Sequence, residues 1–213
     1  MRELQPILTI TGSDSTGGSG VQADIKTISE LGGYAVSAIT SITVQNTLGI
    51  QEFFDVPAEI VSGQIEAIMN DIQPSVVKVG MIRKVETLDV IIDALTKYRP
   101  DYIVYAPAIW SSNGDALMTE DVVSQIKYRL LPLCSAVVAR KKENDIMLQD
   151  SIIGCNITQK LSSQKISKAF SDLGFNRLRT KHSRGFIAII RTAEEIRNYQ
   201  ISQGIDASGN LPF

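Results

Sequence analysis

A glycine-rich loop between a short apolar strand and a helix constrains the fold of this chain more than any other feature. The segment ILTITGSDSTGGSGVQAD, residues 7–24, places four glycines after the apolar strand Ile7–Ile10. Glycine allows a sharp turn and lets a ligand approach the backbone closely. The loop leads into a predicted helix near Val21, where free N–H groups favour polar or anionic ligands. This order predicts a ligand-binding loop in an α/β fold, and a tight connection that binds nothing is the alternative.

Two common nucleotide-binding motifs do not match this loop. A P-loop ends in Gly-Lys-Ser/Thr, whereas Gly20 is followed by Val21 and Gln22. A dinucleotide fingerprint needs G-x-G-x-x-G spacing and an acidic residue at the end of the second strand. Here the glycines stand at 12, 17, 18 and 20, and the second strand ends in VQNT, residues 44–47. The sequence therefore argues against NAD as the ligand.

Composition narrows the class of protein. With 213 residues and 44% hydrophobic residues, the chain fits one α/β domain over residues 1–213. A net charge of −2 gives no basic surface for nucleic acid, and no apolar run is long enough to span a membrane. Cys134 and Cys155 lie far apart without metal-ligand spacing, which indicates reduced thiols and no metal site. We expect a cytoplasmic protein without a signal peptide.

Strands and helices alternate through the first two thirds of the chain. Apolar patterns predict strands at 7–10, 34–44, 52–56, 76–79, 102–105 and 135–139, and helices at 21–31, 57–70, 85–98 and 119–130. This alternation predicts a mainly parallel sheet covered by helices on both faces. Right-handed crossovers would bring the carboxyl ends of the strands to one edge, where ligands bind in such folds. Gly12, Gln45, Gly80, Met81 and the loop 106–110 should therefore converge.

Two finer expectations concern helix faces and the last third. The helix at 57–70 should bury Ile60, Ile65, Ile68 and Met69 on one face, and Thr119 should cap the helix at 119–130. After residue 139 the pattern predicts a charged, solvated loop at 140–145, a helix at 162–173, a strand at 186–190, a helix at 192–200 and a loose tail at 204–213.

The order of several motifs resembles the hydroxymethylpyrimidine/phosphomethylpyrimidine kinases, thiamin-pathway members of the ribokinase-like superfamily. The matching stretches are TITGSDSTGGSGVQADIKTISELGGY (9–34), AITSITVQNTLGI (38–50), VVKVGMI (76–82), SNGDALM (112–118) and RLLPLCSAVVA (129–139). The resemblance implies a three-layer α/β/α fold with a mainly parallel central sheet. Residues 1–139 match well, whereas residues 140–213 diverge, so the C-terminal part is expected to be truncated or rearranged.

The resemblance also implies a pyrimidine site. In it, Gln45 would pair with the aminopyrimidine edge, Thr43 and Val44 would lie beside it, and Met81 would pack on the ring. Gly12 and Ser19 would line the ring pocket, Asp24 would serve the hydroxymethyl arm, and Ala108 follows the strand ending at 105. An amide offers donor and acceptor together, and a thioether adapts to an aromatic face. The alternatives are a loop-stabilising Gln45, a core Met81 and an Asp24 that serves only the helix start.

The catalytic half of the family pattern is not found, so the catalytic residues are unknown. Family members carry a late G-T-G-C or G-T-G-D motif whose amides neutralise the moving phosphoryl group, and this sequence has no G-T-G triplet. Ala106 stands where the family has aspartate, and Ser112 stands where it has lysine. The basic stretch Arg140–Lys142 could contact phosphate. His182, the single histidine, has no evident partner.

Three functions follow from these observations. The leading one is a kinase-like protein that binds 4-amino-5-hydroxymethyl-2-methylpyrimidine or its phosphate, with phosphotransfer impaired or lost. The second is an active kinase of thiamin biosynthesis that uses non-standard groups, and the third is an interaction module with a vestigial pocket. The resemblance implies ATP and Mg²⁺ as cofactors and a homodimer as the assembly.

Overall fold

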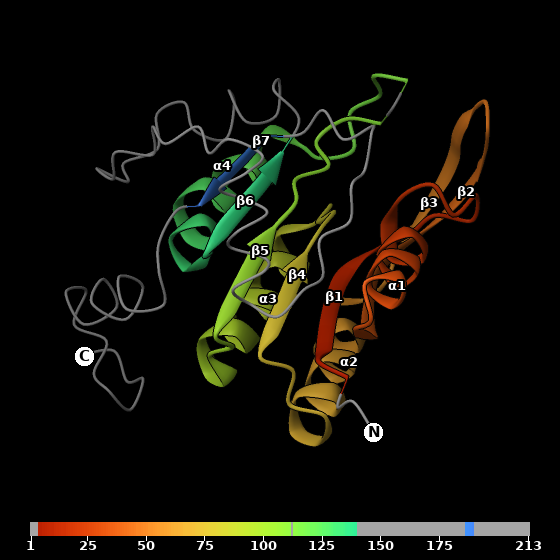
Figure 1. Ribbon diagram of the computed structural model, residues 1–213. Coiled ribbons are helices and arrows are strands. Elements are labelled where there is room, and N and C mark those ends of the chain that lie inside the picture. Colours follow the sequence, from red (N-terminus) through yellow and green to blue (C-terminus); the bar gives the residue numbers. More distant parts are fainter. Residues whose placement is uncertain (1–3, 112, 140–185, 190–213) are drawn as a thin grey trace.

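The computed structural model of the protein describes residues 4–111, 113–139 and 186–189 (Figure 1). These residues build a seven-stranded sheet in the order β3-β2-β1-β4-β5-β6-β7. The strands are β1 (Pro6–Ser13), β2 (Tyr34–Asn46), β3 (Gly49–Asp55), β4 (Val76–Val79), β5 (Tyr102–Tyr105), β6 (Ala136–Ala139) and β7 (Phe186–Ile189). The helices are α1 (Gly20–Glu30), α2 (Ala58–Asp71), α3 (Val85–Tyr98) and α4 (Glu120–Gln125).

The sheet is mainly parallel, as the alternating pattern predicts. The five inner strands β2, β1, β4, β5 and β6 run parallel to one another, whereas the edge strands β3 and β7 pair antiparallel with β2 and β6. Strands β2 and β3 form a long hairpin that extends away from the rest of the sheet (Figure 1). The loops that follow β1, β4 and β5 therefore open at the same edge as this hairpin.

The helices lie on both faces of the sheet, which gives the three-layer α/β/α arrangement. Helix α1 lies on one face, and α2 and α3 lie on the other (Figure 1). Alternation along β1 explains the division, because successive side chains of a strand point to opposite faces. Leu8 and Ile10 join the hydrophobic core with Ile65 of α2 and Leu88 of α3. Thr9 instead reaches a side chain of α1.

Two sequence expectations about helices need correction. In α2 the buried residues are Val61, Ile65 and Met69, whereas Ile60 is 54% exposed and does not belong to the core face. Thr119 does cap α4, accepting from the Val122 N–H at 3.4 Å. The α-helix ends at Gln125, however, and continues as a π-helical turn at Ile126–Leu130 and a 3₁₀ turn at Leu131–Leu133. Pro132 explains the change, because a proline ring clashes with the α-helical turn before it and lacks an N–H.

Several expectations for the last third lie outside the described residues. The predicted strand at 186–190 is present as β7. The predicted helices at 162–173 and 192–200, the basic stretch Arg140–Lys142, Cys155 and His182 belong to the part that the structure does not describe. Across the described ranges, no helix has the length and apolar character needed to cross a membrane.

Candidate functional site

Asp14 organises the glycine-rich loop. Its side chain is only 5% exposed, and its carboxylate accepts from the backbone N–H groups of Thr16 and Ser19 at 2.8 and 2.7 Å. The hydroxyls of the same two residues donate to it at 2.7 and 2.8 Å. Burial raises the pKa of Asp14, but these hydrogen bonds stabilise the charged form and lower the pKa overall. Asp14 is therefore an ionised, acceptor-only group at neutral pH.

Gly20 fixes the way in which this loop enters α1. Its φ is +59°, and a Cβ at this position would overlap with the carbonyl oxygen of Gly12. Only glycine adopts such a conformation without strain. Ser19 is the N-cap residue of α1, but its hydroxyl binds Asp14 and makes no capping bond to the helix. The loop is thus folded around the Asp14 carboxylate, with Ser19 exposed on its outer side.

Gln45 reaches the same carboxylate from β2. Its Nε2 donates to Asp14 Oδ1, and its Oε1 lies 3.0 Å from the hydroxyl of Thr43. The Thr43 hydroxyl also donates to the carbonyl oxygen of Ser13 at 2.8 Å. Thr43 and Gln45 therefore lie against the glycine loop, and for Gln45 this agrees with the convergence expected from the strand ends. Val44, between them, is 52% exposed and points to the opposite face of the hairpin.

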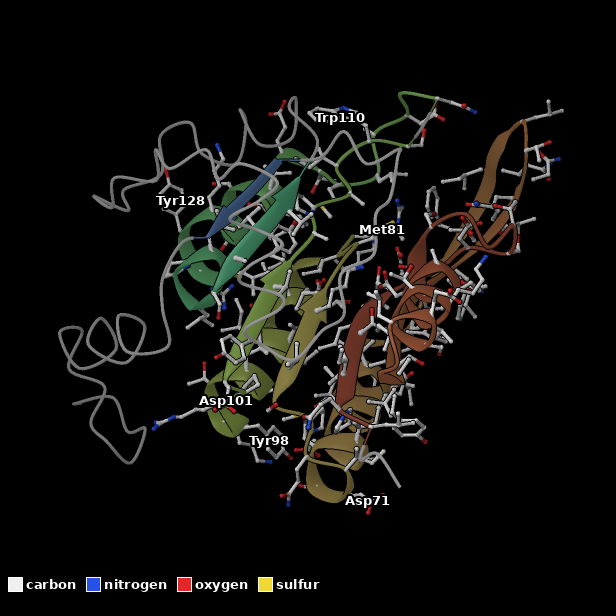
Figure 2. All side chains as sticks on the ribbon, viewed as in Figure 1. Asp71, Met81, Tyr98, Asp101, Trp110 and Tyr128 are labelled. Atoms are coloured by element: carbon white, nitrogen blue, oxygen red, sulfur yellow. The ribbon has the colours of Figure 1, made fainter. Side chains whose placement is uncertain are left out.

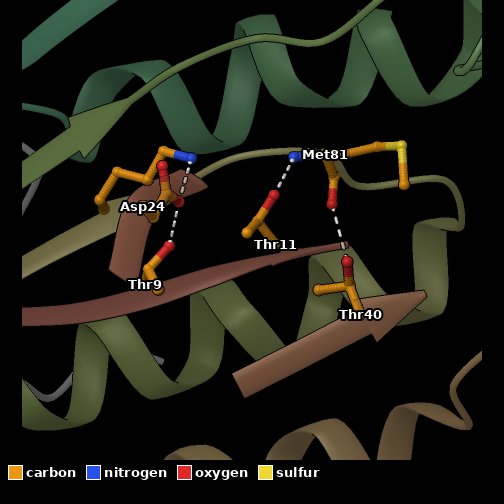
Figure 3. A network of polar contacts seen from close by, with 6 residues as sticks. Thr9, Thr11, Asp24, Thr40 and Met81 are labelled. Carbon is orange, nitrogen blue, oxygen red and sulfur yellow. Dashed lines mark hydrogen bonds and ion pairs between the residues drawn. The ribbon is translucent and has the colours of Figure 1, made fainter. Parts of the chain in front are cut away.

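Met81 is held by two neighbouring strands. Its backbone N–H donates to the hydroxyl of Thr11 at 3.1 Å, and its carbonyl accepts from the hydroxyl of Thr40 at 2.9 Å (Figure 3). Both threonines are almost fully buried. A Cβ at Gly12 would overlap with the terminal methyl of Met81, so these residues are in contact. Met81 lies beyond the end of β4, at the same edge of the sheet as Trp110 (Figure 2).

Asp24 lies apart from this group, on the α1 face of the sheet. It accepts from the Thr9 hydroxyl at 2.5 Å (Figure 3). It also forms an ion pair with Lys78 of β4 at 2.7 Å. An ideal Cβ on Gly80 would come within 2.9 Å of Lys78 Nζ, so the ammonium points toward the carboxyl edge of β4. Lys78 is the partner of Asp24 that the sequence reasoning missed, although its place in VVKVGMI gives the only charge in that strand.

Arg83 joins the hairpin to the loop after β5. Its Nε pairs with Asp55 of β3 at 2.9 Å, and its Nη1 donates to the carbonyl of Leu117 at 2.9 Å. The guanidinium also stacks on Phe53 of β3, 3.6 Å from the ring centroid. A planar guanidinium suits this combination of ion pairing and stacking. No local pattern predicts these contacts of Arg83, because its partners are distant in the chain.

A second link joins the tip of the hairpin to the same loop. The Nδ2 of Asn113 donates to the carbonyl oxygen of Leu48 at 2.7 Å. Ala108, farther back in this loop, packs against the hydrophobic core. Together with Arg83, Asn113 fixes the hairpin that carries Thr43 and Gln45. The described residues thus bring together the loop, the hairpin and Met81, with Asp24 behind them.

The chemistry offered by this arrangement is that of recognition. It combines a glycine-lined approach, an amide with donor and acceptor atoms, and a buried thioether. Among the described residues, no group of three His, Cys, Asp or Glu side chains could hold a metal ion. The described part of the chain therefore provides no acidic cluster to fit Mg²⁺, and we derive no step through a metal–nucleotide complex.

Comparison with known proteins identifies relatives of this chain. The family model for phosphomethylpyrimidine kinase matches residues 14–179. The hydroxymethylpyrimidine/phosphomethylpyrimidine kinase of Rhizobium meliloti (strain 1021) is 43% identical over 147 residues, which cover 69% of this chain and 55% of that protein. The corresponding kinase of Haemophilus influenzae is 33% identical and covers 82% of this chain. The chain spans 63% of the length of that second relative.

A solved structure agrees with these sequence matches. The crystal structure of phosphomethylpyrimidine kinase from Clostridium difficile 630 superposes with a TM-score of 0.66 at 29% identity, covering 96% of both chains. This likeness confirms the ribokinase-like α/β fold expected from the sequence. Because the family model covers most of the chain and the relatives agree with it, this protein belongs to the phosphomethylpyrimidine kinase family.

Proposed function

We propose that this chain binds 4-amino-5-hydroxymethyl-2-methylpyrimidine, or its monophosphate, at the carboxyl edge of β1, β2 and β4. The observation that carries the proposal is the Gln45 amide, which is held against the glycine loop, and Gly12 of that loop contacts the buried Met81. The contact residues would be Gly12, Ser19, Asp24, Thr43, Val44, Gln45, Met81 and Ala108. Sequence identity to enzymes named for this substrate supports the assignment.

Each proposed contact has a physical basis. The Gln45 amide would pair with the ring edge, and the Met81 thioether would pack on the ring face. Gly12 lets the Met81 side chain lie directly against the loop, since a Cβ there would overlap with the terminal methyl of Met81. Val44 would contribute through its backbone, since its side chain points away. Asp24 forms an ion pair with Lys78 and would lie toward the hydroxymethyl arm of the ligand.

Phosphoryl transfer to this arm is, in our proposal, impaired or lost. The printed sequence has no G-T-G triplet to provide the amide cluster that neutralises the transferred group. Loss of a single donor of this kind costs about 10² to 10³ in rate. The second candidate is an active kinase of thiamin biosynthesis with Mg²⁺–ATP as phosphate donor, since its relatives are named as kinases. A related pyridoxal kinase from Staphylococcus aureus was solved in complex with ADP (26% identity, TM-score 0.61, covering 68% of this chain and 52% of that one).

Calorimetry and a turnover assay separate these functions. The protein is titrated with the pyrimidine alcohol, with its monophosphate and with Mg²⁺–ATP, and product formation is followed with both substrates present. Pyrimidine binding without turnover supports the leading proposal, and turnover supports the active kinase. Binding of neither pyrimidine would overturn the proposal and favour an interaction module. Sedimentation of the same samples tests the proposed homodimer, and fractionation of cells tests the proposed cytoplasmic location.

A further inference from the structure

We infer that Asp14 is a positioning residue that fixes the orientation of the Gln45 amide, so that the site selects an aminopyrimidine over the corresponding oxopyrimidine. This inference rests on the proposed pyrimidine site and adds a specificity-determining residue to it. It concerns a side chain that makes no proposed contact with the ligand.

The first step concerns the direction of the amide. Asp14 is ionised and can only accept hydrogen bonds, so it binds the Nε2 group of Gln45. If the amide turned over, Oε1 would face a carboxylate oxygen, and two acceptors would repel each other. The carboxylate itself cannot turn away easily, because four donors from Thr16 and Ser19 hold it. Asp14 therefore allows one orientation of Gln45.

The Gln45 amide retains hydrogen-bonding capacity beyond its contacts with Asp14 and Thr43. The Thr43 hydroxyl has one proton and two nearby acceptors, the Ser13 carbonyl at 2.8 Å and Gln45 Oε1 at 3.0 Å. Gln45 Oε1 therefore retains capacity to accept another donor. On the other side, among the residues that the structure describes, the second Nε2 proton has only Thr16 Oγ1 nearby, at a long 3.5 Å. Gln45 thus retains one acceptor and one donor in fixed positions.

The third step compares this pattern with the ligand. A 4-aminopyrimidine presents an exocyclic N–H donor beside a ring-nitrogen acceptor, which complements the carbonyl and N–H of the held amide. The 4-oxo analogue presents a carbonyl acceptor beside a ring N–H donor, which is the reverse order. Binding it in the same pose would require the Gln45 amide to turn over, and Asp14 opposes that change. Selectivity for the amino form follows.

Isothermal titration of the two pyrimidines tests the inference. The unsubstituted protein should bind 4-amino-5-hydroxymethyl-2-methylpyrimidine about tenfold to a hundredfold more tightly than its 4-oxo analogue, as expected for hydrogen bonds with a buried polar group. In Asp14→Asn the new amide can accept from or donate to Gln45, so either orientation is allowed. We expect the affinity ratio to fall by about tenfold. Lys26→Met is the matched control, because Lys26 holds the loop through the Gly17 carbonyl without touching Gln45.

The outcomes are distinct. An unchanged ratio in Asp14→Asn, with the pyrimidines still bound, overturns this inference alone, whereas absence of binding to the unsubstituted protein overturns the proposed function as well. A ratio that falls equally in Lys26→Met also overturns the inference, since general loosening of the loop would then explain it.

A second measurement does not depend on the folding of Asp14→Asn. In NMR spectra of the unsubstituted protein, one side-chain amide proton of Gln45 should resonate downfield and exchange slowly with solvent. Its resonance is assigned by its disappearance from the spectrum of Gln45→Met. Rapid exchange of both protons, as in an exposed glutamine, would overturn the inference.

Discussion

The buried hydroxyl of Thr40 donates to the carbonyl oxygen of Met81 at 2.9 Å, across 41 residues of sequence. The opposite side of the same residue is bound by Thr11, which accepts from the Met81 N–H. A loop residue next to the proposed ligand is therefore bonded to β1 and β2 at once (Figure 3).

Replacing Thr40 with valine keeps the shape of the side chain and removes its hydroxyl. The Met81 carbonyl would then be buried without this donor, so we expect the free energy of unfolding to fall by about 1–3 kcal/mol. Urea unfolding measures the change. Thr27→Val, at an exposed position of α1, is the control and should change little. Equal stability of Thr40→Val and the unsubstituted protein would show that the bond contributes nothing.

A methyl group at Gly12 would overlap with the end of the Met81 side chain. Gly12→Ala should therefore push the flexible end of the Met81 side chain aside at a cost below about 1 kcal/mol of stability, and it should weaken binding of the pyrimidine because the thioether is displaced. Thermal unfolding and calorimetry measure the two effects. Gly63→Ala in α2 is the matched control, because nothing lies within 4 Å of the new Cβ. That control should stabilise the helix by about 0.5–1 kcal/mol.

The lowered pKa of Asp14 makes stability depend on pH in acid. The folded protein binds this proton less readily than the unfolded chain, so stability rises with pH through this range. The contribution of Asp14 is complete well above its ordinary pKa of 3.8 and is lost as the pH falls through the lower folded-state value. Unfolding in urea between pH 3 and 6 should show this slope, and Asp14→Asn should flatten it. An identical slope in the variant would contradict the assignment.

Arg83→Lys keeps the positive charge but removes the planar group that stacks on Phe53 and reaches Leu117. We expect a loss of about 1–2 kcal/mol of stability, from a charged hydrogen bond and the stacking contact. Chemical denaturation measures it. Lys97→Ala, at the exposed ion pair with Glu66, is the control and should have little effect. If both variants lost the same stability, the contacts of Arg83 would have no special role.

Gln45→Ala tests the proposed site directly. Removing the amide takes donor and acceptor away from a buried ligand edge, so the affinity for the pyrimidine should fall by about 1–3 kcal/mol. Calorimetry at neutral pH gives the value. Lys97→Ala again serves as the control, because it lies on α3, away from the glycine loop. An unchanged affinity in Gln45→Ala would remove Gln45 from the site.

Sequence periodicity predicted most of the fold. The strands at 76–79 and 102–105 and the helix at 85–98 begin and end where expected, since each has a clear apolar pattern between turn residues. Other boundaries moved for local reasons. Strand β2 continues to Asn46 because it pairs with β3, a contact that the pattern of one strand does not contain. The helical pattern predicts Ile60 on the core face, but in the structure Val61 is buried there and Ile60 is exposed.

The candidate site could be predicted only in part. The glycine loop and Gln45 follow predicted strand ends, and topology alone places them at one edge. Thr43 lies within the predicted strand at 34–44, so only the family resemblance pointed to it. The bond between Asp14 and Gln45 spans 31 residues, and the pair Asp24–Lys78 spans 54, so neither has a local signal. A polar residue inside an apolar strand, such as Thr9 or Lys78, was the available clue. Buried polar groups require partners, which the sequence does not name.

The two backbone hydrogen bonds of Met81 restrict how the proposed site could change to accept other ligands. The backbone N–H of Met81 is bonded to β1 and its carbonyl oxygen to β2. The ends of these strands and of β4 therefore cannot shift separately without breaking a buried hydrogen bond. Widening the proposed pyrimidine site by sliding one strand would therefore break a hydrogen bond to a neighbouring strand. A bulkier ring could therefore be accepted only through substitutions of side chains, with the backbone unchanged.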